Sequence, residues 1–286
     1  MNADRAAREF VSVGEGAVSY LEWRTSRSRL LVFVHATGFN AETYTGLLAP
    51  LQAQFRVLAC DLRGHGFTTL RGRPGLAQGW SVFRDDLLEL VARLDPRPLV
   101  LAGHSLGATV SLMAAAAEPL LVRSLFLVEP VLIPGVAGDL HKPASGLEQK
   151  AAQRRSVFPS FEAALDAYRG RGIFTSWPDS AIRDYLAGGL IEAGDGTFRL
   201  ACEPVWEAEI FRESPAGVAH IARGITCPLT ILHGTNASTA PPSELATVQD
   251  LKPDARVVAV DGGGHFLPIE RPELVREEVL AATAGI

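Results

Sequence analysis

Short apolar runs alternate with amphipathic segments through the first half of the chain. Four runs have the length of a strand: residues 30–34, 56–60, 99–102 and 125–128. Continuous apolar character is typical of strands covered on both faces. Segments 44–51, 82–94 and 106–117 between them have the apolar spacing of helices. With an early strand pair at 9–13 and 18–23, this alternation predicts an α/β fold with a mostly parallel sheet and helices on both faces.

The strand rhythm stops at about residue 131 and returns after residue 223. Helical segments at 163–168 and 181–186 fall in this interval, which is rich in aromatic residues and has no clear buried strand. Strands are predicted again at 229–232 and 255–260, followed by a last helix at 272–282. We therefore predict a core domain of residues 1–130 and 224–286, with a helical cap inserted at 131–223.

Composition narrows the class of protein. The 286 residues are 47% hydrophobic and 21% charged, which is typical of a globular enzyme. A net charge of −5 argues against a nucleic-acid partner, and no run approaches the length of a membrane span. The three sparse cysteines, Cys60, Cys202 and Cys227, indicate a reducing compartment. We expect a cytoplasmic protein that acts on a small molecule; composition leaves its oligomeric state open.

The most informative motif is Gly103-His104-Ser105-Leu106-Gly107, between a buried strand and a helix. Glycine on both sides of the serine indicates a turn so tight that a flanking side chain would collide with its surroundings. Such a turn holds the serine hydroxyl at its apex, facing a cleft at the end of the sheet. The pattern predicts that Ser105 is a nucleophile.

A serine nucleophile needs a general base and an oxyanion site. His265 follows the last predicted strand in a glycine-rich loop, Asp261-Gly262-Gly263-Gly264-His265, and is the predicted base. The backbone N–H of Leu106 is one predicted oxyanion donor. The loop after strand 30–34 is expected to supply the second, from Thr37. We predict packing for His104 and a role in a tight turn for His65.

Four motifs in this order resemble the α/β-hydrolase superfamily, over nearly the whole chain. They are the Ser105 turn, Gly264-His265-Phe266, residues 35–39 (His-Ala-Thr-Gly-Phe) and residues 61–66 (Asp-Leu-Arg-Gly-His-Gly). The resemblance implies an eight-stranded, mostly parallel sheet, a helical cap, and Ser-acid-His chemistry that needs no cofactor. Ala36 stands where family members usually have glycine, which is expected to shift the oxyanion loop slightly.

The acid departs from the usual family pattern. Most members carry it after the seventh strand, but residues 234–239 contain no carboxylate. Some members, haloalkane dehalogenases among them, place it after the sixth strand, where this chain has Glu129. Because a histidine base needs a buried acceptor on its other nitrogen, Glu129 is the predicted acid. Two alternatives stay open: Asn236 could orient the ring without charge, or Glu129 could be only a structural partner of the cap.

The predicted reaction is hydrolysis of an ester, lactone or thioester through an acyl-serine. Aromatic residues in the cap suggest a substrate with an apolar part. No spacing typical of metal ligands or of a dinucleotide site is found. The alternatives are a non-catalytic ligand-binding homologue, a cofactor-free perhydrolase, and a hydrolase of carbon–carbon bonds.

Most charged residues of the predicted cap are assigned to solvent. They comprise two acidic and four basic residues: Glu207, Glu209, Arg154, Arg155, Arg169 and Arg171. Any of the arginines could instead meet a carboxylate or phosphate of the substrate.

Overall fold

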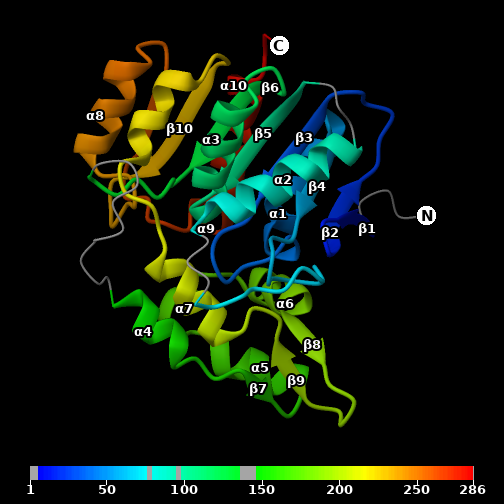
Figure 1. The fold of residues 1–286 in the computed structure, drawn as a ribbon. Helices are drawn as coiled ribbons and strands as arrows, with labels where there is room; N and C mark the ends of the chain where they lie inside the picture. Colours follow the sequence, from blue (N-terminus) through cyan, green and yellow to red (C-terminus); the bar gives the residue numbers. More distant parts are fainter. Residues whose placement is uncertain (1–5, 76–78, 95–97, 136–145, 286) are drawn as a thin grey trace.

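Eight strands form one twisted sheet at the centre of the molecule (Figure 1). The computed structural model describes residues 6–75, 79–94, 98–135 and 146–285. The strands lie in the order β1-β2-β4-β3-β5-β6-β10-β11. Their bounds are β1 Ala7–Val13, β2 Gly16–Trp23, β3 Leu30–Val34, β4 Arg56–Cys60, β5 Leu99–His104, β6 Val122–Val128, β10 Leu229–Gly234 and β11 Arg256–Val260.

The sheet is antiparallel only at its N-terminal edge. Strand β2 pairs antiparallel with β1 and with β4, whereas the pairs from β4 through β11 are parallel. The predicted eight-stranded, mostly parallel sheet is therefore confirmed. The carboxyl ends of the parallel strands share one edge, where the loops after β3, β5, β6, β10 and β11 meet.

Helices cover both faces of the sheet. On one face pack α2 (Ser81–Leu94), α3 (Leu106–Ala117), η4 (Val218–Gly224) and α8 (Pro242–Leu251). On the other lie α1 (Thr45–Leu48), α9 (Leu267–Glu270) and α10 (Pro272–Ala282). The helix predicted at 44–51 is divided into η1 (Glu42–Tyr44), α1 and η2 (Ala49–Ala53), with Pro50 in the first turn of η2.

The side chains of β3 show how one strand serves two cores. Val32 and Val34 pack toward α2 and α3, and Leu31 and Phe33 pack toward α1 and α10. All four are at most 2% exposed. This alternation explains why the sequence of the strand is apolar throughout, since neither face meets water.

Residues 146–214, here termed the inserted segment, lie below the sheet in the view of Figure 1. They form α4 (Leu147–Ala152), α5 (Phe161–Tyr168), η3 (Gly172–Thr175), α6 (Asp179–Gly189) and α7 (Pro204–Arg212). They also form a small sheet of β7 (Val157–Phe158), β9 (Phe198–Leu200) and β8 (Leu190–Glu192). These strands were not predicted, because two or three residues are too few to show the alternation of apolar and polar positions that marks a strand. The domain limits at 131 and 223 stay a prediction.

Helix α7 connects the inserted segment to the core through buried groups. The indole of Trp206 donates to the carbonyl of Arg63 over 3.1 Å, and an added Cβ at Gly72 would lie only 2.2 Å from that indole. The predicted solvent exposure of Glu207 and Glu209 is wrong, because both are at most 8% exposed. Burial is tolerated because each carboxylate has an arginine partner.

The three cysteines are buried thiols, none of them in a disulfide. Among the described residues no helix has the length and apolar character that crossing a bilayer requires. The same residues contain no group of three or more His, Cys, Asp or Glu side chains arranged to hold a metal ion.

Candidate active site

Ser105 occupies the turn between β5 and α3 in a strained backbone conformation. Its φ is 56° and its ψ is −118°, a region that residues with a side chain rarely adopt. An added Cβ at Gly103 would lie 2.4 Å from the carbonyl oxygen of Gly107, and one at Gly107 would lie 2.1 Å from that of Val34. The crowding predicted from the two glycines is therefore present at both positions.

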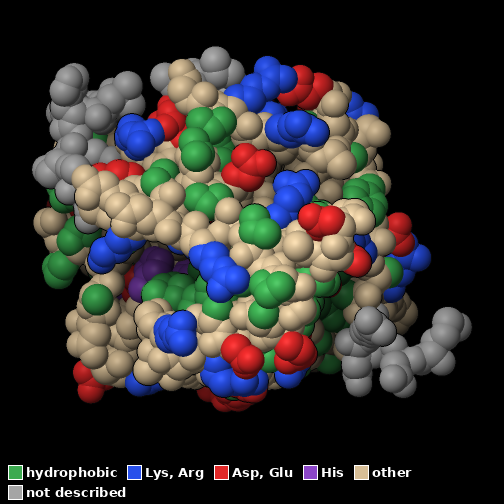
Figure 2. All heavy atoms as spheres, turned by 90° about the horizontal axis from the view of Figure 1, so that it is seen from below, with side chains coloured by type: hydrophobic (Ala, Val, Ile, Leu, Met, Phe, Trp, Pro, Cys, Tyr) green, Lys and Arg blue, Asp and Glu red, His purple; other side chains and the backbone are tan. Residues whose placement is uncertain are grey.

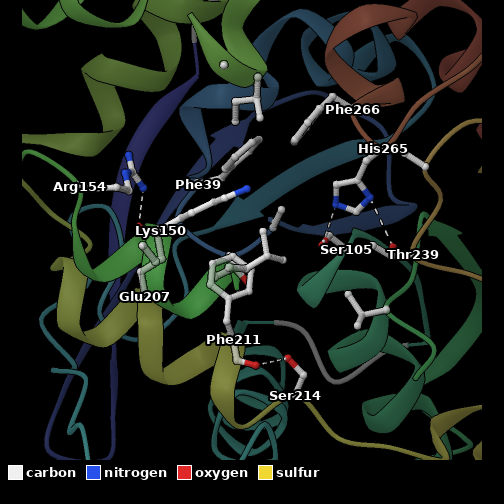
Figure 3. Close-up of a pocket in the computed structure, with 18 of the residues that line it drawn as sticks. Phe39, Ser105, Lys150, Arg154, Glu207, Phe211, Ser214, Thr239, His265 and Phe266 are labelled. Atoms are coloured by element: carbon white, nitrogen blue, oxygen red, sulfur yellow. Dashed lines mark hydrogen bonds and ion pairs between the residues drawn. The ribbon is translucent and has the colours of Figure 1, made fainter. Parts of the chain in front are cut away.

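Ser105, His265 and Glu129 form one hydrogen-bonded chain. The Ser105 Oγ lies 3.1 Å from His265 Nε2, and the Nδ1 of the same ring lies 3.2 Å from Glu129 Oε2 (Figure 3). The hydroxyl donates to Nε2 when Nδ1 carries the ring proton and donates to the carboxylate. Three loops far apart in the sequence thus bring together a hydroxyl, an imidazole and an acid in the order that acyl transfer requires.

Glu129 is held as a buried acceptor. It is fully buried, and its carboxylate accepts hydrogen bonds from the Gly234 N–H at 2.5 Å and from the Ser238 hydroxyl and Thr239 N–H at 3.0 Å. Burial acts to raise the pKa of Glu129, but the hydrogen bonds from His265, Gly234 and Thr239 outweigh it and place the pKa below its usual value. The carboxylate is therefore ionised at neutral pH.

Asn236, the alternative orienting residue, does not reach the histidine. It is exposed, and among the described residues its side chain makes no hydrogen bond to His265. The loop that carries it instead donates to Glu129, through Gly234 and Thr239. The hydroxyl of Thr239 also lies 3.4 Å from His265 Nδ1.

In the loop after β3, the N–H group of Thr37 has no acceptor among the described residues. The N–H groups of Ala36, Gly38 and Phe39 each donate to an acceptor in the protein. Within the described residues, the N–H groups of Thr37 and Leu106 have no such bond. Thr37 lines the same cavity as Ser105, and Leu106 is the first residue of α3. The two N–H groups predicted to bind the oxyanion are therefore without a protein acceptor, one directly after Ser105 and the other in a residue that lines the same cavity.

Two buried histidines, His35 and His65, pack against each other at the Thr37 loop. The ring centroids of His35 and His65 are 4.8 Å apart. The Nε2 of His65 accepts from the Gly38 N–H at 3.1 Å, and that of His35 accepts from the Leu62 N–H at 2.8 Å. Burial lowers the pKa of His35 to about 4, and burial with the neighbouring imidazole lowers that of His65 to about 3.

This pair predicts that the protein loses stability in mild acid. The pKa values of these histidines are lower in the folded state than in the unfolded chain. Below about pH 6.5 the unfolded chain therefore binds more protons, and the free energy of unfolding decreases as the pH is lowered. Between pH 7 and 5 the expected loss is about 2 kcal/mol for each such histidine. Urea unfolding at both pH values measures it, and His65→Gln should reduce the difference. Equal midpoints at pH 7 and 5 would contradict the argument.

A second hydrogen-bonded chain links the Thr37 loop to the loop of His265. The Ala36 N–H donates to the Tyr44 hydroxyl at 3.0 Å, and that hydroxyl lies 2.8 Å from His104 Nδ1. The Nε2 of His104 donates to the His265 carbonyl at 2.8 Å. Burial, together with the His265 ring, keeps the pKa of His104 well below its usual value, so the imidazole stays neutral. His104 is therefore packed, as predicted, and also hydrogen-bonded at both nitrogens.

Ser105 and His265 line a cavity of about 970 Å³. Phe39, Phe174 and Phe266 contribute to its largely apolar wall. In Figure 2 a hollow on the lower face shows a histidine inside it, hydrophobic side chains around it, and Lys and Arg side chains near its rim. The cavity has room for a small organic substrate with an apolar part.

Three charged side chains from the inserted segment also line the cavity: Lys150, Arg154 and Glu207 (Figure 3). The prediction of a solvated surface role for Arg154 is wrong, since its guanidinium pairs with the Glu207 carboxylate at 2.5 Å. It also donates to the hydroxyls of Tyr168 and Tyr185. Sequence analysis did not select Lys150, because one lysine in a polar segment carries no signal of its own.

Comparison with known proteins agrees with this architecture. A family model described as "Alpha/beta hydrolase family" matches residues 31–278. A 2-(acetamidomethylene)succinate hydrolase of Mesorhizobium japonicum is 28% identical over 98% of this chain and 97% of its own length. An (E)-2-((N-methylformamido)methylene)succinate hydrolase of Acinetobacter baylyi is 20% identical over 88% of this chain and 89% of its own.

A solved structure gives the same result in three dimensions. The crystal structure of an E-2-(acetamidomethylene)succinate hydrolase superposes with a TM-score of 0.80 at 25% identity, covering 98% of this chain and all of that one. The family model spans most of the chain, from β3 to α10, and includes the three loops that carry Ser105, Glu129 and His265. The chain belongs to the alpha/beta hydrolase family.

Proposed function

We propose that this chain is a serine hydrolase whose nucleophile is Ser105. In the first step the Oγ of Ser105 attacks the carbonyl carbon of the substrate while His265 Nε2 takes the hydroxyl proton. The ionised carboxylate of Glu129 fixes the ring tautomer and stabilises the imidazolium that forms. The N–H groups of Thr37 and Leu106 donate to the oxygen of the tetrahedral intermediate.

The second half of the reaction uses the same groups in reverse. His265 gives its proton to the leaving group, which leaves an acyl group on Ser105. A water molecule that enters the cavity then loses a proton to His265 and attacks the acyl carbon. Collapse of that intermediate returns the proton to Ser105 and releases the carboxylic acid.

The observation that carries this proposal is the unbroken chain from the Ser105 hydroxyl to the Glu129 carboxylate through one imidazole, with links of 3.1 and 3.2 Å. A purely structural role would not require a buried, ionised carboxylate to hydrogen-bond to a histidine that also contacts a serine on a strained turn. The same chain counts against the alternative of a non-catalytic ligand-binding homologue.

The relatives point to a substrate that is not a plain ester. Both curated relatives are named for hydrolysis of a methylene succinate with an N-acyl group. The N-acyl group in these names offers an amide carbonyl to Ser105, so acyl transfer from it would break a carbon–nitrogen bond; the carbon–carbon bonds of the skeleton are the alternative point of cleavage. We therefore propose a small acidic acyl compound as substrate, and carbon–carbon bond hydrolysis as the second candidate reaction. A cofactor-free perhydrolase would use the same three side chains, but no observation favours it.

Covalent labelling combined with a substrate panel tests the proposal. A fluorophosphonate should modify Ser105, as located by peptide mass spectrometry. The panel holds an ester, a thioester, a lactone and an N-acylaminomethylene succinate, and product masses distinguish acyl transfer from carbon–carbon cleavage. Failure to label Ser105 in the folded protein, with no turnover of any substrate in the panel, would exclude a serine hydrolase.

A further inference from the structure

Lys150 is an exposed residue that brings a positive charge to the lining of a largely apolar cavity. It belongs to α4 of the inserted segment, and Figure 3 shows its side chain extending into the cavity that Ser105 and His265 also line. Among the residues that the structure describes, its ammonium has neither a hydrogen-bond nor an ion-pair partner. Lys150 is exposed to solvent, so water solvates its ammonium in the free protein, and a carboxylate that enters the cavity can replace this water with a charge-assisted hydrogen bond.

The other charges at the cavity do not supply that partner. Glu207 is the acidic residue among the described residues that line the cavity, and its charge is already matched by Arg154 at 2.5 Å. The same guanidinium also donates to Tyr168 at 2.9 Å and to Tyr185 at 2.6 Å. Once this internal pair is counted, Lys150 is the remaining charge among the described residues of the inserted segment that line the cavity.

We propose that the Lys150 ammonium binds a carboxylate of the substrate and thereby selects acidic acyl compounds. This inference rests on the proposed function, because it places the carboxylate across the cavity from the carbonyl group that Ser105 attacks. A lysine is suited to the task, since its flexible stem lets one ammonium follow carboxylates on acyl chains of different length. Phe39 and Phe266 then face the apolar carbons between the carboxylate and the reacting carbonyl.

The test compares two esters that differ by one carboxylate: 4-nitrophenyl hydrogen adipate and 4-nitrophenyl hexanoate. The wild-type enzyme should have the higher kcat/KM for the adipate. Lys150→Gln should lower kcat/KM for the adipate by about tenfold or more and leave that for the hexanoate within about twofold. The hexanoate reports on the serine chemistry, and the ratio of the two values reports on Lys150.

Arg155→Gln is the matched control. Arg155 is exposed on the same segment, lies outside the cavity lining and donates to the carbonyl of Val157. Its replacement removes the same unit of charge, so the ratio should stay at the wild-type value. Equal losses for both esters in Lys150→Gln, no change in the ratio, or a wild-type preference for the hexanoate would overturn the proposal.

A binding measurement separates this inference from the proposed function. Calorimetry with succinate as the probe and Ser105→Ala as the protein requires no turnover. Adding Lys150→Gln to that variant should weaken succinate binding by about tenfold or more. Such a loss would support the anion site even if Ser105 were never labelled by a fluorophosphonate. Unchanged binding, or no binding of succinate to either variant, would overturn it.

Discussion

Replacing Ser105 with alanine should lower kcat by about 10⁴-fold or more, the range seen when a triad nucleophile is removed. The reason is geometric: no other hydroxyl lies within hydrogen-bonding distance of His265 Nε2 among the described residues. Steady-state kinetics with 4-nitrophenyl hexanoate, at enzyme concentrations high enough to exceed spontaneous hydrolysis, measures the effect. The fluorophosphonate label should disappear in the same variant.

Two controls make this result specific to the hydroxyl. Alanine keeps the Cβ at a position whose φ is 56°, so the unfolding midpoint should stay close to that of the wild type. Ser111 in α3 donates to the Gly107 carbonyl, away from the cavity lining, and Ser111→Ala should retain activity. Activity within tenfold of the wild type in Ser105→Ala would show that another group attacks the substrate.

Glu129→Gln should lower kcat by about 10⁴-fold, the effect of converting a triad acid to its amide. The amide has no negative charge to stabilise the imidazolium. It also cannot accept at both ends, so its NH₂ group must face either the Gly234 N–H or the donors at the other oxygen, Ser238 and Thr239. The ring of His265 then loses its fixed tautomer. Turnover at neutral pH, with circular dichroism to verify folding, measures the outcome.

Asn236→Ala is the matched comparison, because the two residues were the alternatives for orienting the ring. The exposed position of Asn236 predicts that kcat of this variant stays within about twofold of the wild type. The reverse pattern, a large loss in Asn236→Ala with little change in Glu129→Gln, would place the acid of the site in the loop after β10. Equal losses in both variants would indicate a role in loop structure only.

The sheet could be predicted from sequence because its strands are covered on both faces. An apolar run such as that of β3 has one physical interpretation when helical segments flank it. The inserted segment was harder to predict. Its strands have two or three residues, and its buried acids, Glu207 and Glu209, are stabilised by arginine partners that local sequence does not reveal.

The candidate site divides in the same way. Ser105 and His265 were identified from glycines that local geometry demands, and Glu129 from a missing carboxylate in the loop after β10. Lys150 and the pairing of Arg154 with Glu207 could not be found, because they depend on how the inserted segment lies over the sheet. Contacts between elements that are distant in the sequence leave no local pattern in it.

The chain of hydrogen bonds from Ala36 through Tyr44 and His104 to the His265 carbonyl has a fixed direction, with each group donating to the next. Its members come from three separate parts of the sequence, and none can be displaced without leaving a buried polar group unsatisfied. The Thr37 loop and the loop of His265 should consequently unfold together in a single cooperative event. Amide hydrogen exchange would then give equal free energies of opening for two regions that are far apart in the sequence.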